Sequence, residues 1–127
     1  MKTSIEFTRA PIVPPAANFS APETGACLEF SGIVRESENG RKISGLNYEA
    51  YEPMARTELE KIFQELGARH LCEEIRFIHR LGFVPAGEAS LFIRICSSHR
   101  QPGLDSMGEL IDRLKRDVPI WKRPAKS

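Results

Sequence analysis

The chain has 127 residues, of which 41% are hydrophobic and 28% charged, and its formal net charge at pH 7 is +1. This length suits one compact domain over residues 1–127, and the composition excludes disordered, fibrous and membrane-spanning proteins. A charge near zero argues against a nucleic-acid-binding protein. The three widely spaced cysteines form no CxxC metal half-site, and the sequence opens with no apolar signal core. We therefore expect a soluble cytoplasmic protein with reduced thiols and no metal site.

The N-terminal part divides into a proline-rich segment, residues 1–24, and the start of the core, residues 25–123. The prolines predict that any strand near residues 5–7 gives way to extended, irregular structure packed along the surface. Alternating apolar side chains then predict strands over 26–35 and 43–51. Asn39-Gly40 predicts the turn between them, because both residue types tolerate positive φ.

The rest of the chain alternates helices and strands. Apolar residues at three- and four-residue intervals predict a helix over 54–68 and a second helix over 104–117, which Pro119 ends. Strand-like alternation covers 74–79 and 89–97. The order predicts an α+β domain in which two principal helices pack on a mainly antiparallel sheet.

Ser97-Ser98-His99-Arg100 lies where a strand ends and a helix begins, a junction that often presents side chains and free backbone N–H groups to ligands. Arg100 offers a planar fork for phosphate or carboxylate, and His99 can donate to the same anion. The alternative is that His99 is an ordinary surface or capping residue. Cys96 with His99 also suggests a thiol nucleophile and its base, but no orienting third residue is evident.

Basic residues gather at the C-terminus, where Lys115 precedes Pro119 and Lys122 follows it. Pro119 makes a continuous helix through both lysines unfavourable, so we expect Lys115 on the last helical turn and Lys122 on an extended segment that returns toward it. Such a pair suits an anionic ligand, and Arg35, at the end of the first core strand, adds a third cation. The alternative is a solvated helix face whose lysines complement the helix dipole.

Five motifs occur in order through the core: Phe30-Ser31-Gly32-Ile33-Val34-Arg35, Tyr48-Glu49-Ala50-Tyr51 with Met54-Ala55, Gly87-Glu88-Ala89-Ser90, Ser98-His99-Arg100, and Ile111-Asp112-Arg113-Leu114-Lys115 leading to Val118-Pro119-Ile120-Trp121-Lys122. Together they make residues 25–123 resemble the catalytic (large) subunit family of molybdopterin synthase. The resemblance implies an α/β-hammerhead fold. It also implies a sulfurtransferase of molybdenum cofactor biosynthesis that acts on cyclic pyranopterin monophosphate and needs no cofactor of its own.

The resemblance further implies a small ubiquitin-like sulfur-carrier subunit that ends in a Gly-Gly thiocarboxylate. Two large subunits would form a homodimer within a heterotetramer, and residues of both would build each pocket. The family's substrate-binding positions fall on Ile33, Val34, Arg35, His99, Arg100, Lys115, Lys122, Arg123 and Pro124. Phe30 and Ile111 would line the pocket.

Within that set, Lys115 is the predicted catalytic residue and Lys122 its support, because concentrated positive charge stabilises an oxyanion or supplies a proton beside the carrier tail. Arg35, His99 and Arg100 would hold phosphate. One alternative is a non-catalytic or regulatory homologue that keeps only the site for the ubiquitin-like partner. Another is a small nucleic-acid binder using the basic C-terminus, which the near-neutral charge disfavours.

Overall fold

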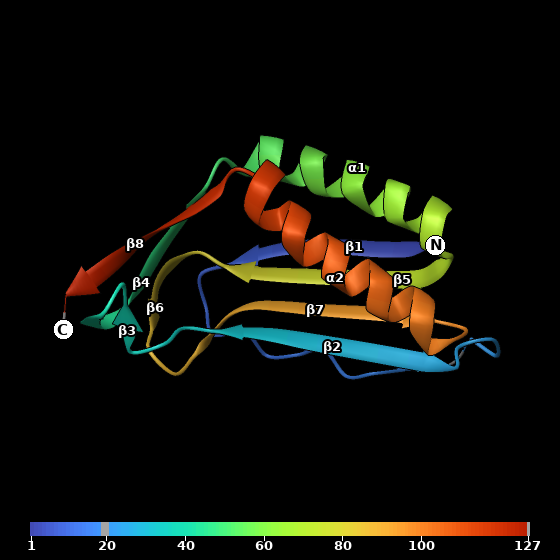
Figure 1. The fold of residues 1–127 in the computed structure, drawn as a ribbon, viewed down its shortest axis with the longest axis horizontal. Coiled ribbons are helices and arrows are strands. Elements are labelled where there is room, and N and C mark those ends of the chain that lie inside the picture. Colours follow the sequence, from blue (N-terminus) through green and yellow to red (C-terminus); the bar gives the residue numbers. More distant parts are fainter. Residues whose placement is uncertain (19–20, 127) are drawn as a thin grey trace.

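The computed structural model describes residues 1–18 and 21–126. The strands are β1 (Lys2–Thr8), β2 (Ala26–Ile33), β3 (Ser37–Glu38), β4 (Arg41–Ala50), β5 (Cys72–Arg80), β6 (Gly82–Pro85), β7 (Ala89–Ser97) and β8 (Ile120–Lys126). The helices are α1 (Glu52–His70) and α2 (Arg100–Asp117). Figure 1 shows α2 running diagonally across one sheet with α1 beside it. The predicted α+β class, with two principal helices on a mainly antiparallel sheet, is confirmed.

The main sheet has the strand order β1-β5-β7-β2. The prediction that no strand persists near residues 5–7 is wrong, because β1 pairs in parallel with β5 from Lys2 opposite Glu74 to Thr8 opposite Arg80. The first proline is Pro11, and a proline restricts only its own backbone and that of the residue before it. The irregular segment therefore starts after the strand.

A large apolar core lies between the main sheet and the helices. Leu59, Ile62, Phe63 and Leu66 of α1 are buried in this core, where α1 packs against α2, β1 and β5. Burial of this apolar face stabilises the helix. The opposite face of β7 is covered too. Arg94 donates to the carbonyl of Pro15 at 2.6 Å and to Glu29 at 2.6 Å, so the proline-rich segment packs on the sheet as expected.

Two boundaries differ from the sequence prediction. Helix α2 starts at Arg100 rather than residue 104, because Pro102 lies in the first turn, where its missing N–H has no intrahelical partner. Strand β6 was not predicted, since its four residues are too short for a period-two pattern to be read. The predicted turn is confirmed, with φ of +52° at Asn39 and +77° at Gly40.

Strands β3, β4, β6 and β8 form a second sheet, in which β4 pairs with each of the other three. This second sheet extends from one end of the molecule (Figure 1) and has its own small core of Val34, Ile43, Leu46 and Val84. A backbone hydrogen bond of 3.1 Å from the Tyr51 N–H to the Pro119 carbonyl joins the chain just after β4 to the chain just before β8. This bond lies next to the start of α1 and the end of α2. Neither helix of the described chain has the length and apolarity to cross a membrane.

Candidate functional site

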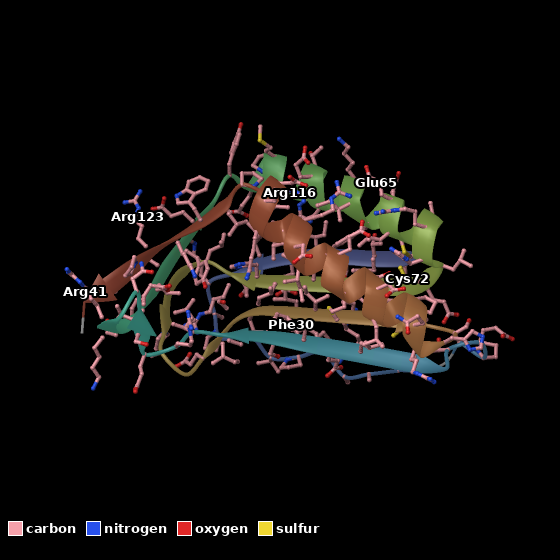
Figure 2. All side chains as sticks on the ribbon, viewed as in Figure 1. Phe30, Arg41, Glu65, Cys72, Arg116 and Arg123 are labelled. Carbon is pink, nitrogen blue, oxygen red and sulfur yellow. The ribbon has the colours of Figure 1, made fainter. Side chains whose placement is uncertain are left out.

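A cavity of ≈ 480 Å³ lies where the main sheet, the end of α2 and the second sheet meet. Five residues singled out in the sequence line it: Phe30, Ile33, Ile111, Lys115 and Lys122. They come from β2, α2 and β8, so the fold brings together three separate parts of the chain. In Figure 2, Phe30 lies on β2, and Arg123, next to Lys122, lies on β8. A second hollow, of ≈ 590 Å³ between Met1 and the end of α1, contains no lysine, arginine or histidine side chain.

Four polar or aromatic residues that line the cavity were not predicted: Tyr48, His79, Ser90 and Trp121. His79 and Ser90 are buried on strands whose sequence pattern indicates only core packing. Tyr48 stands directly opposite Lys122 in the β4–β8 pairing, a register that the sequence does not reveal. The remaining wall is apolar and consists of Gly32, Leu91, Leu114 and Ile120.

The two lysines occupy the positions expected from Pro119. Lys115 lies on the last turn of α2, the helix ends at Asp117, and Lys122 follows on β8. Lys122 Nζ lies 3.6 Å from Glu38 Oε2. Lys115 forms no ion pair with any residue that the structure describes, which leaves its positive charge uncompensated at the cavity wall.

Arg35 is connected to the lysine pair through Glu38 of β3. The Arg35 side chain is 78% exposed, and its Nη2 lies 3.9 Å from Glu38 Oε1, while the other carboxylate oxygen faces Lys122. One carboxylate therefore bridges two of the predicted cations. Val34, in contrast, is buried in the core of the second sheet, and its backbone bonds with Glu88 and Gly87.

His99 and Arg100 lie at the opposite end of α2 from Lys115. At a rise of 1.5 Å per residue, the fifteen residues from Arg100 to Lys115 span about 22 Å. One chain therefore does not bring these predicted phosphate ligands to the cavity. Arg123 and Pro124 lie on β8 outside the cavity lining, and Arg123 pairs with Glu49 at 3.7 Å.

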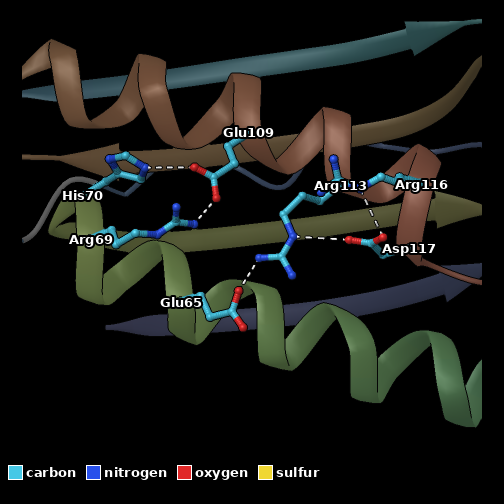
Figure 3. Close-up of polar contacts among 7 residues, drawn as sticks. All are labelled: Glu65, Arg69, His70, Glu109, Arg113, Arg116 and Asp117. Carbon is cyan, nitrogen blue, oxygen red and sulfur yellow. Dashed lines mark hydrogen bonds and ion pairs between the residues drawn. The ribbon is translucent and has the colours of Figure 1, made fainter.

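Other cations of the basic C-terminal region connect the two helices (Figure 3). Arg113 of α2 bonds with Glu65 of α1 and with Asp117, and Arg116 bonds with Asp117 at 3.2 Å. The hydrogen bond from Arg113 lowers the pKa of Glu65, and the bond from Arg116 lowers the pKa of Asp117. Arg116 therefore fits the alternative of a solvated helix face, and Arg113 is a largely buried, charge-paired residue between the helices. Lys115 lacks such a partner among the described residues.

The thiol of Cys96 is unsuited to nucleophilic chemistry. Burial and the neighbouring Cys27 raise the pKa of Cys96 to about 12, so almost none of it is thiolate near pH 7. The three cysteines are free thiols. These observations remove the basis for a thiol-protease interpretation.

The family model described as MoaE protein matches residues 7–117 of the chain. The "Molybdopterin synthase catalytic subunit" of Homo sapiens is 42% identical over 103 residues, which cover 81% of this chain and 55% of that protein. The subunit of the same description from Arabidopsis thaliana is 45% identical over 104 residues, covering 82% of this chain and 52% of that protein. The chain thus spans about half the length of the curated relatives it matches.

Solved structures match over nearly the whole chain. "The X-ray Crystal Structure of Molybdopterin Synthase from Staphylococcus aureus" aligns with a TM-score of 0.86 at 31% identity, covering 96% of this chain and 90% of that one. A "Protein-protein complex of subunit 1 and 2 of Molybdopterin-converting factor" from Helicobacter pylori aligns with a TM-score of 0.76 at 23% identity, covering 94% of this chain and 83% of that one. The second likeness concerns the fold alone. The first bears out the α/β-hammerhead type expected from the sequence.

Proposed function

Because this chain belongs to the MoaE protein family, we propose that it is the catalytic subunit of a molybdopterin synthase, a sulfurtransferase of molybdenum cofactor biosynthesis. Its substrate would be cyclic pyranopterin monophosphate, which receives the two dithiolene sulfurs. The observation that carries this proposal is Lys115, a lysine without an acidic partner among the described residues, on the wall of a cavity that also holds Lys122.

The cavity suits such a substrate in size and charge. A volume of ≈ 480 Å³ falls within the range of small-molecule sites. Its apolar wall can cover the faces of a heterocycle, while Lys115, Lys122 and the nearby Arg35 attract a phosphate. Glu38 lies beside both Lys122 and Arg35, so it would compete with an external anion for these two cations.

Sulfur would arrive as the thiocarboxylate of a small ubiquitin-like partner ending in Gly-Gly. The thiocarboxylate sulfur would add to a carbonyl carbon of the substrate, whose C=O π bond opens as its oxygen takes a proton. Water would then add to the acyl carbon and cleave the acyl–sulfur bond, which leaves a thiol on the substrate and a carboxylate on the carrier. The former carbonyl oxygen would later leave as water. Negative charge develops on the acyl oxygen as water adds. The Lys115 ammonium would stabilise this oxyanion or return a proton, and Lys122 would support it.

The proposal includes a second copy of the chain. His99 and Arg100 lie about 22 Å along α2 from Lys115, so they complete the phosphate site only if a partner chain in a homodimer presents them. With one small subunit at each end, the assembly would be a heterotetramer. The free thiols support a cytoplasmic location, where disulfides are rare.

The test is reconstitution of the purified chain with thiocarboxylated partner and cyclic pyranopterin monophosphate, with molybdopterin as the measured product. Lys115→Ala is expected to lower the rate about 100-fold or more, the usual cost of removing an oxyanion-stabilising group. Lys61→Ala on the exposed face of α1 removes the same charge away from the cavity and should leave the rate unchanged.

Two outcomes would count against the proposal. Full activity of Lys115→Ala would refute the assigned role of Lys115. A parent chain that binds the partner and forms no product would instead indicate a non-catalytic homologue that has kept only the partner site.

A further inference from the structure

We propose that His79 is a specificity-determining residue of this cavity, in which its Nε2 atom accepts a hydrogen bond from an N–H or O–H group on the heterocycle of the substrate. The inference rests on the proposed function and assigns an orientation to the ligand. The lysines would hold the anionic end, and His79 would recognise the ring.

The position of His79 is fixed by the main sheet. It lies near the end of the central strand β5, opposite Phe7 of β1 and Leu91 of β7. Its side chain is buried, with 4% of the residue exposed, yet it lines the cavity. The ring also packs against Tyr48 with centroids 5.0 Å apart, so little rotation is open to it.

The hydrogen bond on the other ring nitrogen determines the tautomer. His79 Nδ1 lies 2.8 Å from the carbonyl oxygen of Arg80. A carbonyl accepts and never donates, so Nδ1 carries the hydrogen. In the neutral ring Nε2 then has a lone pair, and no residue that the structure describes donates to it. Among the described residues, the only fully buried polar side-chain atom without a partner is Arg80 Nε. Nε2 of His79 is therefore accessible from the cavity, where a donor group of a bound ligand can reach its lone pair.

The surroundings of the ring favour its neutral form. Burial lowers the pKa of His79. Besides His79, the titratable groups among the described residues that line the cavity are Tyr48 of β4, Lys115 of α2 and Lys122 of β8. None of these described lining residues is a carboxylate that would favour an imidazolium. Arg80, the next residue on β5, pairs with Glu88 at 2.7 Å. His79 therefore stays an acceptor at neutral pH.

Besides His79, the side chains in the cavity lining that can accept a hydrogen bond from a ligand are the hydroxyls of Tyr48 and Ser90. These hydroxyls can also donate, whereas neutral His79 Nε2 can only accept. The lysines only donate. Trp121 Nε1 donates to Glu49 at 3.1 Å, and the Ser90 hydroxyl lies 3.5 Å from the carbonyl of Gly32. A phosphate has acceptor oxygens and suits the lysines, whereas a reduced pterin ring carries N–H donors and suits His79.

The first experiment observes the imidazole directly. Nitrogen-15 NMR of the parent, with His70 and His99 assigned by substitution, should show His79 neutral at pH 7 with hydrogen on Nδ1. Cyclic pyranopterin monophosphate should shift the Nε2 resonance, and inorganic phosphate alone should not. A protonated ring, the opposite tautomer, or an Nε2 resonance unchanged by the bound substrate overturns the proposal.

The second experiment measures affinity by calorimetry. His79→Asn keeps an N–H for Arg80 but ends short of the cavity, and should weaken substrate binding on the order of tenfold, the value of about one hydrogen bond. Phosphate binding should not change, and His79→Gln, whose amide oxygen reaches farther, should recover part of the loss. His70→Asn, outside the cavity, serves as the control, and thermal unfolding verifies each fold.

The pH dependence gives a further readout. Once Nε2 gains a proton it becomes a donor. Because the pKa of His79 is lowered, parent affinity should hold through the ordinary histidine value of 6.5 and fall only as the pH drops through the lowered pKa, while His79→Asn follows only the titration seen with inorganic phosphate. Equal affinities of the parent and His79→Asn would refute this inference alone. A parent that binds no pyranopterin would refute the proposed function.

Discussion

Glu38 is the carboxylate that pairs with both Lys122 and Arg35. Its side chain is only 17% exposed, so the pairing is less screened by water than most surface ion pairs. An incoming phosphate has to displace this carboxylate before it can use either cation. Glu38 therefore limits the affinity of the site for anions.

Glu38→Gln should tighten the binding of inorganic phosphate about three- to tenfold, because it removes an internal competitor worth on the order of 1 kcal/mol. Glu36→Gln is the matched control. It makes the same change in net charge two residues away, where the side chain is exposed and forms no ion pair with the described residues. Calorimetry would measure both variants, and equal affinities would show that Glu38 does not compete.

At the residue scale, the sequence predicts cations more successfully than their partners. Lys115 and Lys122 stand out because Pro119 separates a helix from a returning segment. Glu38 and His79 were not predicted as site residues. Glu38 lies in a polar stretch that predicts a turn, and His79 lies in a stretch that predicts a buried strand. Their significance depends on the β4–β8 register and on the end of β5, which only the folded chain defines.

Among the elements, α1 and α2 are joined by the bridge from Arg113 to Glu65 and Asp117 (Figure 3). A carboxyl group with a lowered pKa stabilises the fold above its unfolded pKa, and this stability is lost as the pH falls through the folded value. For Glu65 the loss begins near the ordinary glutamate value of 4.5 and continues below it.

Glu65→Gln should therefore lower the free energy of unfolding at pH 7, and the difference from the parent should shrink toward zero by pH 3. Urea denaturation at both pH values would measure it. Glu60→Gln, on the exposed side of the same helix, should show no such convergence. A deficit of Glu65→Gln that stays constant with pH would contradict the assigned ion pair.

Two glycines, Gly45 of β4 and Gly108 of α2, should respond in opposite ways to substitution by alanine. Gly45 is closely packed, whereas Gly108 has open space around it. A Cβ at Gly45 would lie 2.3 Å from the backbone oxygen of Val84, whereas a Cβ at Gly108 meets nothing within 4 Å. Gly45→Ala must push β6 away from β4. Gly108→Ala only gains helix propensity.

We expect Gly45→Ala to lower the free energy of unfolding by about 2 kcal/mol and Gly108→Ala to raise it by about 1 kcal/mol. Chemical denaturation of the two variants beside the parent would measure both changes. If Gly45→Ala raised the free energy of unfolding as Gly108→Ala is expected to do, the β4–β6 contact would not be tight.

The elements with long periodic patterns were predicted, and the short ones were not. Residues 54–68 and 104–117 lie inside α1 and α2, because several helical turns repeat one apolar stripe. Strand β6 is only four residues long. Strand β1 was not predicted, because the effect of Pro11 on the residues before it was overestimated. Strands β1 and β6 form by pairing with strands that are distant in the sequence, so a local sequence pattern does not reveal them.

At the scale of the whole molecule, His99 lies about 24 Å along the direction of α2 from Lys115, so the proposed anion site needs a second chain to supply His99. Mixing Lys115→Ala chains with His99→Ala chains should restore activity that neither variant has. Random pairing makes half of the dimers mixed, each with one intact site of two, so about a quarter of parental activity is expected. Activity no higher than that of the separate variants would mean that each site is built by one chain.

The second sheet has consequences for how the molecule moves. Its core of Val34, Ile43, Leu46 and Val84 is small beside the core under the helices, so local opening there costs less free energy than unfolding the whole domain. Lys122 and Tyr48 line the cavity from the second sheet, whereas Lys115 lines it from α2 and His79 from the main sheet. We therefore expect the cavity wall formed by the second sheet to open at a lower cost in free energy than the wall formed by the main sheet and α2, which would make room for the C-terminal tail of the proposed partner.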